Sequence, residues 1–220
     1  MALTSSAAID QELRLRIADQ LGAGFKGNII GPDHAGYGEA RTVWNAMVDK
    51  RPGAILRCTS TADVVAAVNV ARANGLPPSI RCGGHSVSGK ALSDGGLTID
   101  MGGIREVTVD AEHRLVHAGG GCLLGDIDQA TAPHGLIVPA GIMSETGVAG
   151  LALGGGIGWF SRKHGLTCDQ FVSSSSCWPA GRSSTSPPPS TPSCSGPSRV
   201  AAATSGWSRG SPSGLASSAR

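Results

Sequence analysis

Hydrophobic and polar positions follow one another in regular patterns along the first 170 residues. Apolar residues recur every four positions from Leu13 to Leu21, with charged residues between them, which predicts an amphipathic helix over 9–21. Residues 25–39 are rich in glycine and contain a proline, which indicates an entry segment before the next domain. We therefore expect residues 1–40 to form an N-terminal helix and an entry segment.

A strand–helix–strand unit follows. Residues 54–58 form an apolar run that predicts a buried strand. Residues 59–75 begin with N-cap candidates, continue with apolar residues at helical spacing and end in Asn-Gly, which predicts a helix. Residues 79–82 predict a second strand. A unit of about 30 residues favours a parallel pair of strands joined by a right-handed crossover.

The pattern changes again after residue 89. Short strand-like runs alternate with turn residues at 97–101, 106–110, 115–119 and 136–139, and a helix is predicted over 123–134. This mixture of helices and strands predicts an α+β domain over 41–170.

Composition separates the last 50 residues from the rest. Residues 1–170 hold 14 basic against 16 acidic side chains, a formal charge of −2, which indicates no nucleic-acid or membrane partner. Residues 171–220 hold four Arg, 17 Ser and seven Pro and no Asp, Glu or Lys. That stretch buries too little apolar surface to offset its conformational entropy. It is predicted to be a Ser/Pro-rich tail that is disordered or translated out of frame.

The sequence lacks the features that mark secreted, membrane-spanning and metal-binding proteins. The N-terminus lacks a basic region followed by an apolar run, and no stretch of about 18 apolar residues exists. The six cysteines lack paired metal-site spacing, which favours reduced thiols and no metal. We therefore expect a cytoplasmic protein.

Two glycine-rich loops carry the candidate chemistry. The first, residues 81–89, follows a predicted strand; Gly83 and Gly84 permit positive φ and a close approach of the backbone to a ligand. Ser86 and Ser88 add hydroxyl donors, and successive backbone N–H groups suit phosphate oxygens.

The second loop, residues 139–158, is able to form the other wall of a dinucleotide site. Neither loop fits a P-loop, and Gly154-x-Gly156 is followed by Trp159 where the Rossmann fingerprint needs glycine or alanine. On spacing alone, ordinary turns explain both loops equally well. Trp44, Trp159 and Phe160 are expected in the core or in a cleft wall, and not as stacking platforms.

The string Arg81-Cys82-Gly83-Gly84-His85-Ser86 resembles the R-x-G-G-H-S loop of the vanillyl-alcohol-oxidase-type (PCMH-type) FAD-binding domain, and within it the berberine-bridge-enzyme-like branch. Matching runs follow in the family's order at 97–101, 118–121, 134–139, 146–159 and 164–169. The resemblance implies an α+β fold, a two-subdomain FAD-binding domain of the vanillyl-alcohol-oxidase type that is incomplete at its C-terminal side.

The resemblance also implies a set of cofactor contacts. FAD is expected between the subdomains, with its pyrophosphate held by the two loops. The implied cofactor-binding residues are Arg81, Cys82, Gly83, Gly84, His85, Ser86, Val87, Ser88, Gly89, Gly141, Ser144, Thr146, Gly147, Gly150, Gly154, Gly155 and Gly156. His85 is expected to bond covalently to the flavin 8α-methyl group. Met143 stands where some members carry a second linking cysteine, so a single link is expected.

The implied activity is that of an FAD-linked oxidoreductase. At full length it is expected to oxidise a small-molecule substrate, an alcohol, a sugar or an amine, and the flavin, not the protein, supplies the redox chemistry. No catalytic base is assigned in this half of the domain, and the oligomeric state is left open.

The family pattern ends near residue 170, where the Ser/Pro-rich tail begins. A codon choice compatible with residues 189–208 reads, in a shifted frame, Leu-Phe-Trp-Ala-Ile-Ala followed by four glycines and Asn-Phe-Gly, which resembles the family's next landmark. The hypothesis is a frameshift near residue 170. The alternatives are an inactive truncated product with weak or no FAD binding, and a different fold whose tail is an interaction segment.

Overall fold

The computed structural model describes residues 9–177, 183–186 and 204–208, and the side chains of residues 9–174. The helices are α1 (Gln11–Leu21), α2 (Tyr37–Ala40), α3 (Thr61–Ala73), α4 (Leu124–Thr131), α5 (Val148–Leu153) and α6 (Ser161–His164), with 3-10 turns η1 (Gly22–Gly24), η2 (Ala132–His134) and η3 (Thr167–Gln170). The strands are β1 (Asn28–Ile30), β2 (Ala54–Arg57), β3 (Ser79–Arg81), β4 (Leu97–Asp100), β5 (Val107–Asp110), β6 (Leu115–Ala118), β7 (Phe171–Cys177), β8 (Ser183–Ser186) and β9 (Thr204–Ser208).

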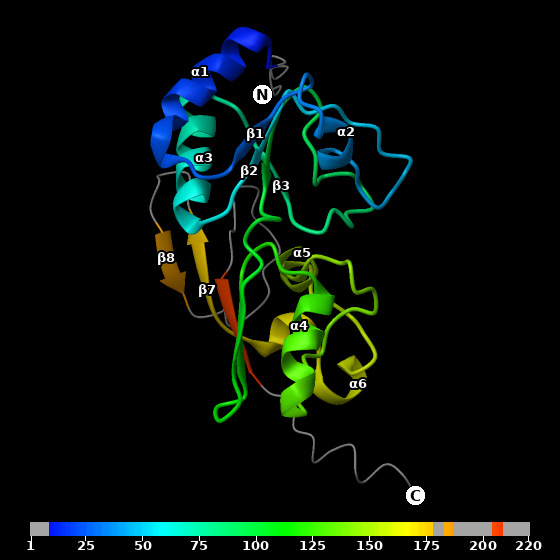
Figure 1. The fold of residues 1–220 in the computed structure, drawn as a ribbon. Helices are drawn as coiled ribbons and strands as arrows, with labels where there is room; N and C mark the ends of the chain where they lie inside the picture. The colour runs from blue at the N-terminus through cyan, green and yellow to red at the C-terminus, as the bar shows by residue number, and fades with distance from the viewer. Residues whose placement is uncertain (1–8, 178–182, 187–203, 209–220) are drawn as a thin grey trace, which may run out of the picture.

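These strands form two sheets. The first has the order β1-β2-β4-β3 and the second the order β5-β6-β9-β7-β8. In Figure 1 the first sheet lies in the upper lobe with α1 and α3 beside it, and α4, α5 and α6 lie in the lower lobe. The mixed α+β class expected from the sequence is confirmed.

The first sheet is parallel except at its β1 edge. β2 and β3 both pair in parallel with β4, and β1 pairs antiparallel with β2. The expected strands therefore run parallel, but the prediction that they are neighbours is wrong, because β4 lies between them. All four residues of β4 are buried, which favours the centre of a sheet that is covered on both faces.

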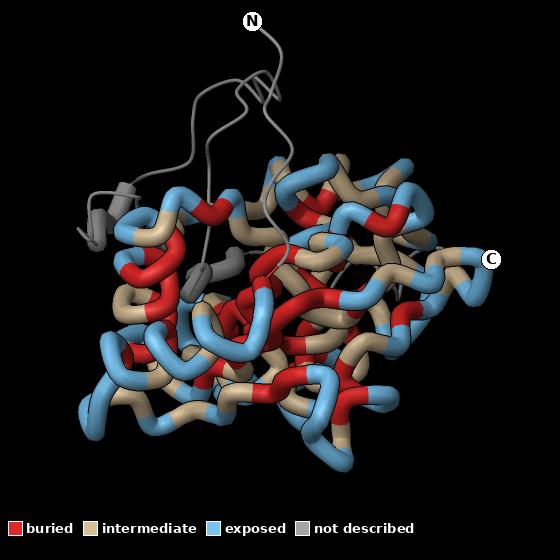
Figure 2. Tube along the Cα trace, turned by 90° about the horizontal axis from the view of Figure 1, so that it is seen from above, coloured by how far each residue is buried: buried red, intermediate tan, exposed pale blue. Residues whose placement is uncertain are grey.

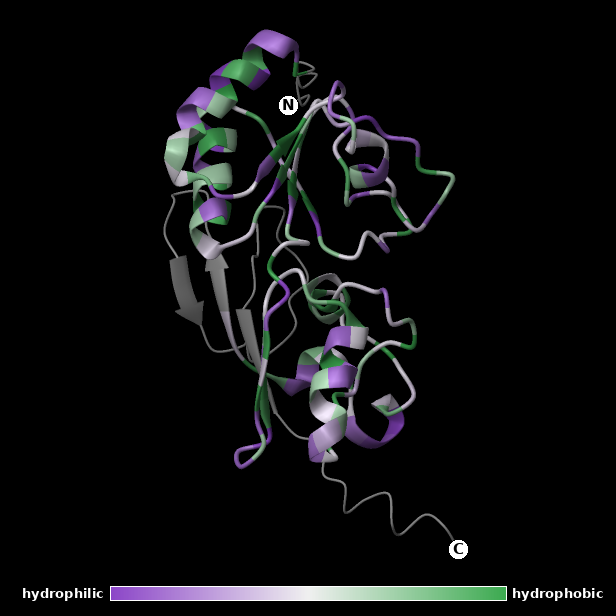
Figure 3. Ribbon diagram, in the orientation of Figure 1, coloured by the Kyte–Doolittle hydropathy of each residue, from purple (hydrophilic) through white to green (hydrophobic). Residues whose placement is uncertain are grey.

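The core of this lobe lies between the sheet and the two helices. Ile17 of α1, Val64 of α3, Leu56 of β2 and Ile99 of β4 are fully buried in one cluster. Figure 3 shows apolar residues gathered along these strands and on α3, and Figure 2 shows the buried positions in the interior of the described chain. Burial of such side chains is the main favourable contribution to folding.

A smaller core holds the second lobe together. Val116 of β6, Ile127 of α4, and Val148 and Ala152 of α5 pack around the buried Cys122. The α4 helix follows β6 in the chain and contributes Ile127 to this core.

The local predictions have mixed outcomes. The entry segment 25–39 contains β1, which pairs with β2, and the start of α2. The predicted helix over 123–134 is confirmed, since α4 ends at Thr131, the 3-10 turn η2 continues to His134, and Gly135 follows in the left-handed conformation. The predicted strand over 136–139 is wrong. Residues 136–139 form no strand, since the Leu136 N–H donates to the Thr131 carbonyl (3.2 Å) and closes the helix end instead.

The described residues after 170 form strands, whereas one of the two predictions for this tail was disorder. β7 pairs antiparallel with β8 and β9, and β9 pairs antiparallel with β6. Strand pairing uses backbone N–H and C=O groups, which serine supplies as well as an apolar residue does. The rest of residues 171–220 and residues 1–8 lie outside the described residues, and the out-of-frame alternative stays a prediction. Within the part described, no helix has the length and apolar character needed to cross a membrane.

One buried carboxylate joins the start of α3 to two other segments. Asp63 has no exposed surface and accepts hydrogen bonds from the Lys26 N–H (2.8 Å), the Thr59 N–H (2.9 Å) and the Thr59 hydroxyl (2.8 Å). Burial raises the pKa of Asp63, but these hydrogen bonds lower it by more, so the pKa lies below its ordinary value of 3.8.

Asp63→Asn should lower the free energy of unfolding by about 1–3 kcal/mol at neutral pH, because buried donors lose a charged acceptor. Because the folded pKa is lowered, this stabilisation is fully present above pH 3.8 and is lost as the pH falls through the folded value. Urea unfolding between pH 3 and pH 7 measures both effects. The exposed Asp19→Asn serves as control, and an equal effect of the two variants would contradict the assignment.

Candidate functional site

The two glycine-rich loops meet backbone to backbone. We call residues 81–89 the histidine loop and residues 139–158 the second loop. A Cβ added to Gly83 would lie 2.4 Å from the Gly147 nitrogen, and one added to Gly147 would lie 2.5 Å from the Gly83 nitrogen. No side chain fits at either position, so glycine is required for this approach.

The second loop is also held to the start of α4. The Leu124 N–H donates to the Thr146 carbonyl (3.0 Å), and the Gly125 N–H donates to the Ser144 carbonyl (2.9 Å). The Val148 N–H donates to the Cys122 carbonyl (2.9 Å). These bonds fix the backbone of Ser144 and Thr146 against the start of α4.

His85 lies where the two loops meet. Its Nδ1 is 3.4 Å from the Thr146 hydroxyl oxygen. Its imidazole ring stacks on the indole of Trp44, with ring centroids 5.5 Å apart and an angle of 20° between the planes. The ring is therefore oriented by residues from two other segments.

The histidine loop presents a run of backbone donors. In the described part of the chain, the N–H groups of residues 85–88 donate to no protein acceptor. The Gly89 N–H closes the turn on the Ser86 carbonyl (3.0 Å), and the Ser86 and Ser88 hydroxyl oxygens lie 3.3 Å apart. Such a series of donors fits an anionic group like the FAD pyrophosphate.

Arg81 and Cys82 at the start of this loop face the protein. Arg81 donates from Nη1 to Asp100 (3.2 Å) and from Nη2 to the Thr42 carbonyl (3.1 Å). The Cys82 thiol donates to the Cys122 carbonyl (3.4 Å). The cofactor contacts expected of Arg81 and Cys82 stay predictions. In the structure both side chains bond to neighbouring segments of the protein and so support the loop.

Asp100 is the centre of a buried ionic group below the loop. Its Oδ2 accepts from Arg57 Nε (3.0 Å) as well as from Arg81, and its Oδ1 accepts from the Gly102 N–H (2.9 Å). The Arg81 Nε has no partner among the described residues. A buried carboxylate with two arginines is costly to break, because removal of one partner leaves an uncompensated charge.

The glycines of the second loop differ in what surrounds them. A Cβ at Gly141 would lie 2.5 Å from the Leu151 side chain, and one at Gly156, where φ is +75°, would lie 2.2 Å from the Thr167 hydroxyl oxygen. A Cβ at Gly150 would meet nothing within 4 Å. Gly150 thus leaves open space beside α5, which a cofactor is able to approach.

Trp44 and Trp159 do not lie in the core, which was one of the two places expected for them. Trp44 is 59% exposed and stacks on His85, and Trp159 is 82% exposed. The Trp44 contact had no signal in the sequence, because the two residues are 41 positions apart and belong to different segments. Among the described residues, no group of three or more candidate ligands is arranged to bind a metal ion.

Comparison with known proteins defines the class of protein. The FAD binding domain family matches residues 52–183, which is more than half of the chain and extends past the expected limit at residue 170. This chain therefore belongs to the FAD binding domain family, whose cofactor is FAD.

The relatives are FAD-linked oxidoreductases. An (R)-6-hydroxynicotine oxidase from Paenarthrobacter nicotinovorans is 35% identical over 148 residues, which are 67% of this chain and 32% of the relative. An uncharacterized FAD-linked oxidoreductase of Bacillus subtilis is 38% identical over 146 residues, 66% of this chain and 32% of the relative. The chain spans about a third of the length of these relatives.

Solved structures share the fold. The 6-hydroxy-D-nicotine oxidase of Arthrobacter nicotinovorans superposes with a TM-score of 0.77 at 28% identity, over 84% of this chain and 42% of that one. A BBE-like 1 protein of Physcomitrella patens gives a TM-score of 0.73 at 30% identity, over 78% of this chain and 37% of that one. These findings confirm the expected family and fold class.

Gly147→Ala should lower the free energy of unfolding by about 1–3 kcal/mol, because the new methyl group has to displace the Gly83 backbone. Gly150→Ala, the control in the same helix region, should raise it by about 0.5–1 kcal/mol, because alanine favours the helix and meets nothing. Urea unfolding compares them, and the same sign for both variants would show that the two loops do not meet as described.

The Cys82 thiol should resist alkylation in the folded chain. Burial raises its pKa to about 11, and burial raises the pKa of Cys122 to about 12. At pH 8 roughly one Cys82 in a thousand is then a thiolate, the form that reacts. Iodoacetamide labelling followed by peptide mass spectrometry measures this, with the unfolded chain as control; equal labelling in both states would contradict it.

Proposed function

We propose that this chain holds FAD covalently through His85 and that the full-length protein oxidises a small alcohol, sugar or amine. The observation that supports the proposal most strongly is the position of His85, which lies at the junction of the two loops with its ring orientation fixed. FAD when bound accepts a hydride equivalent from the substrate, and the protein supplies binding and orientation.

Each of the two loops would bind a different part of the cofactor. The backbone donors of residues 85–88, with the Ser86 and Ser88 hydroxyls, would hold the pyrophosphate. The second loop would approach the cofactor at Gly150, where no side chain intervenes. Ser144, Gly154 and Gly155 are proposed as further contacts from the same loop.

His85 would hold the flavin at its 8α-methyl group through an imidazole nitrogen. Each covalent bond of this kind would release two protons and two electrons, and dioxygen, reduced to hydrogen peroxide, would be the acceptor that balances them. Thr146, with its hydroxyl oxygen 3.4 Å from Nδ1, would hold a proton at the imidazole.

The proposed substrate class is supported by the chemistry of covalently held flavins and by a relative of this chain. A covalently held flavin is suited to poor hydride donors such as alcohols and amines. A relative at 35% identity is an oxidase of hydroxynicotine, an amine, which supports the inclusion of amines. The chain spans about a third of the length of these relatives, so the oxidation of a substrate is proposed for the full-length protein, and weak or no FAD binding by this chain is the alternative.

His85→Ala should abolish covalent flavin and leave the fold intact, because His85 is partly exposed and its contacts are limited to one face of the ring and Nδ1. The chain and the variant are expressed with FAD, denatured and run on a gel under ultraviolet light. The wild-type band should fluoresce and the His85→Ala band should be dark. His134→Ala, at an exposed histidine, is the control and should fluoresce like the wild type.

A frame-restored version extends this test. Fluorescence in the restored protein alone would support the truncated-product alternative for this chain and the covalent link for the full-length protein. Darkness of both proteins, with normal far-ultraviolet circular dichroism, would overturn the covalent link at His85.

A further inference from the structure

The segment before β2 reaches over to the histidine loop. We call residues 41–50 the strap; it carries Trp44 and contains no strand or helix except the residue that caps α2. An exposed indole on an irregular segment would normally be free to change its orientation. Here its ring is stacked on His85 at an angle of 20° between the planes, and contacts along the strap hold it in this position.

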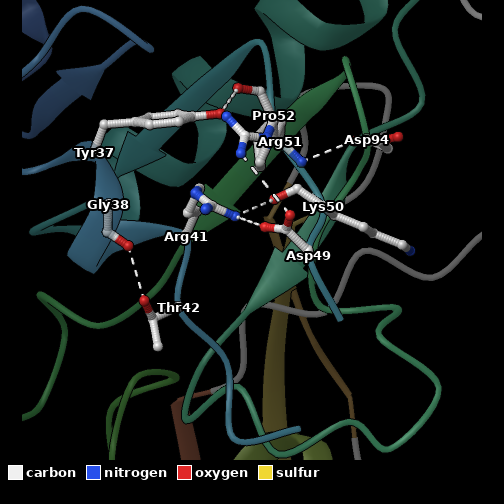
Figure 4. A network of polar contacts seen from close by, with 9 residues as sticks. All are labelled: Tyr37, Gly38, Arg41, Thr42, Asp49, Lys50, Arg51, Pro52 and Asp94. Atoms are coloured by element: carbon white, nitrogen blue, oxygen red, sulfur yellow. Dashed lines mark hydrogen bonds and ion pairs between the residues drawn. The ribbon is translucent and has the colours of Figure 1, made fainter. Parts of the chain in front are cut away.

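The strap is fixed at its base by the polar network drawn in Figure 4. The Arg41 guanidinium bonds to the Asp49 carboxylate and to the Lys50 carbonyl (3.3 Å), which closes the strap into a loop. Next to it, the Arg51 N–H donates to Asp94 Oδ1 (2.8 Å). The two ends of the strap are thus held together and attached to the segment before β4.

Three further contacts attach the strap directly to the histidine loop. The backbone N–H of Trp44 donates to the Gly84 carbonyl (3.2 Å), and the side-chain Nδ2 of Asn45 donates to the Val87 carbonyl (2.9 Å). Lys50 Nζ donates to the Gly89 carbonyl (2.8 Å). These bonds go to backbone carbonyls on both sides of His85, so the strap sets the path of the loop as well as the plane of the ring.

We propose that Trp44 is a positioning residue for His85, and that it fixes the imidazole plane from which the bond to the flavin forms. The inference rests on the proposed covalent link. Trp44 holds one face of the ring and Thr146 holds Nδ1, so the ring has one orientation before the cofactor arrives. A preoriented nucleophile reacts faster than one that rotates, because the entropy of alignment is already lost.

The test compares Trp44→Leu with Trp44→Phe. Flavin-free protein is mixed with FAD, and covalent flavin is followed over time by acid precipitation while total bound flavin is measured separately. Trp44→Leu should bind FAD as the wild type does but attach it roughly 2- to 12-fold more slowly, the range expected for loss of one aromatic stack. Trp44→Phe keeps a stacking ring and should stay within about twofold of the wild type.

A matched control and a second measurement separate positioning from a merely structural role. Trp159→Leu removes another exposed indole, one that is more exposed than Trp44, and should leave the attachment rate unchanged. Proton NMR of the flavin-free chain should show the His85 ring protons shifted upfield by the indole. That shift should be lost in Trp44→Leu and kept in Trp159→Leu.

The outcomes distinguish this proposal from the one on which it rests. Equal attachment rates for Trp44→Leu and wild type, or an unshifted His85 ring, would overturn the positioning role and leave the covalent link standing. A slower rate that matches an equal loss of bound FAD would also overturn it. A wild-type chain that binds FAD without any covalent bond would overturn both.

Discussion

The close contact between Gly83 and Gly147 is the constraint on which the candidate site depends. Each glycine lies where a Cβ would come within 2.5 Å of the other's backbone nitrogen, so a side chain at either position would collide with the other loop. This contact connects the lobe of the first sheet to the lobe of α4 and α5 (Figure 1). It places Thr146 beside His85, and the candidate site follows from that placement.

The histidine loop is supported from below and from one side by different forces. Below it, the buried Asp100 joins the ends of β2, β3 and β4 through Arg57 and Arg81. From the side, the strap bonds to loop carbonyls and covers the His85 ring with Trp44. The N–H groups of residues 85–88 in this loop have no acceptor among the described residues, which fits a site for an anionic ligand.

The sequence was sufficient where local signals agree. The helix of α3 was predictable from its N-cap at Ser60 and its apolar spacing, and the role proposed for His85 comes from its motif. Contacts between distant segments were not predictable, because neither the insertion of β4 between β2 and β3 nor the stacking of Trp44 on His85 leaves a local pattern. The strands after residue 170 were missed for a related reason, since they depend on pairing with β6 and not on their own composition.

The measurement that tests the account most directly is mass spectrometry of a proteolytic digest after expression with FAD. The account predicts a single flavin-bearing peptide, and fragmentation that places the flavin on His85. A flavin on any other residue, or a fully unmodified His85 peptide from folded, FAD-saturated protein, would contradict it.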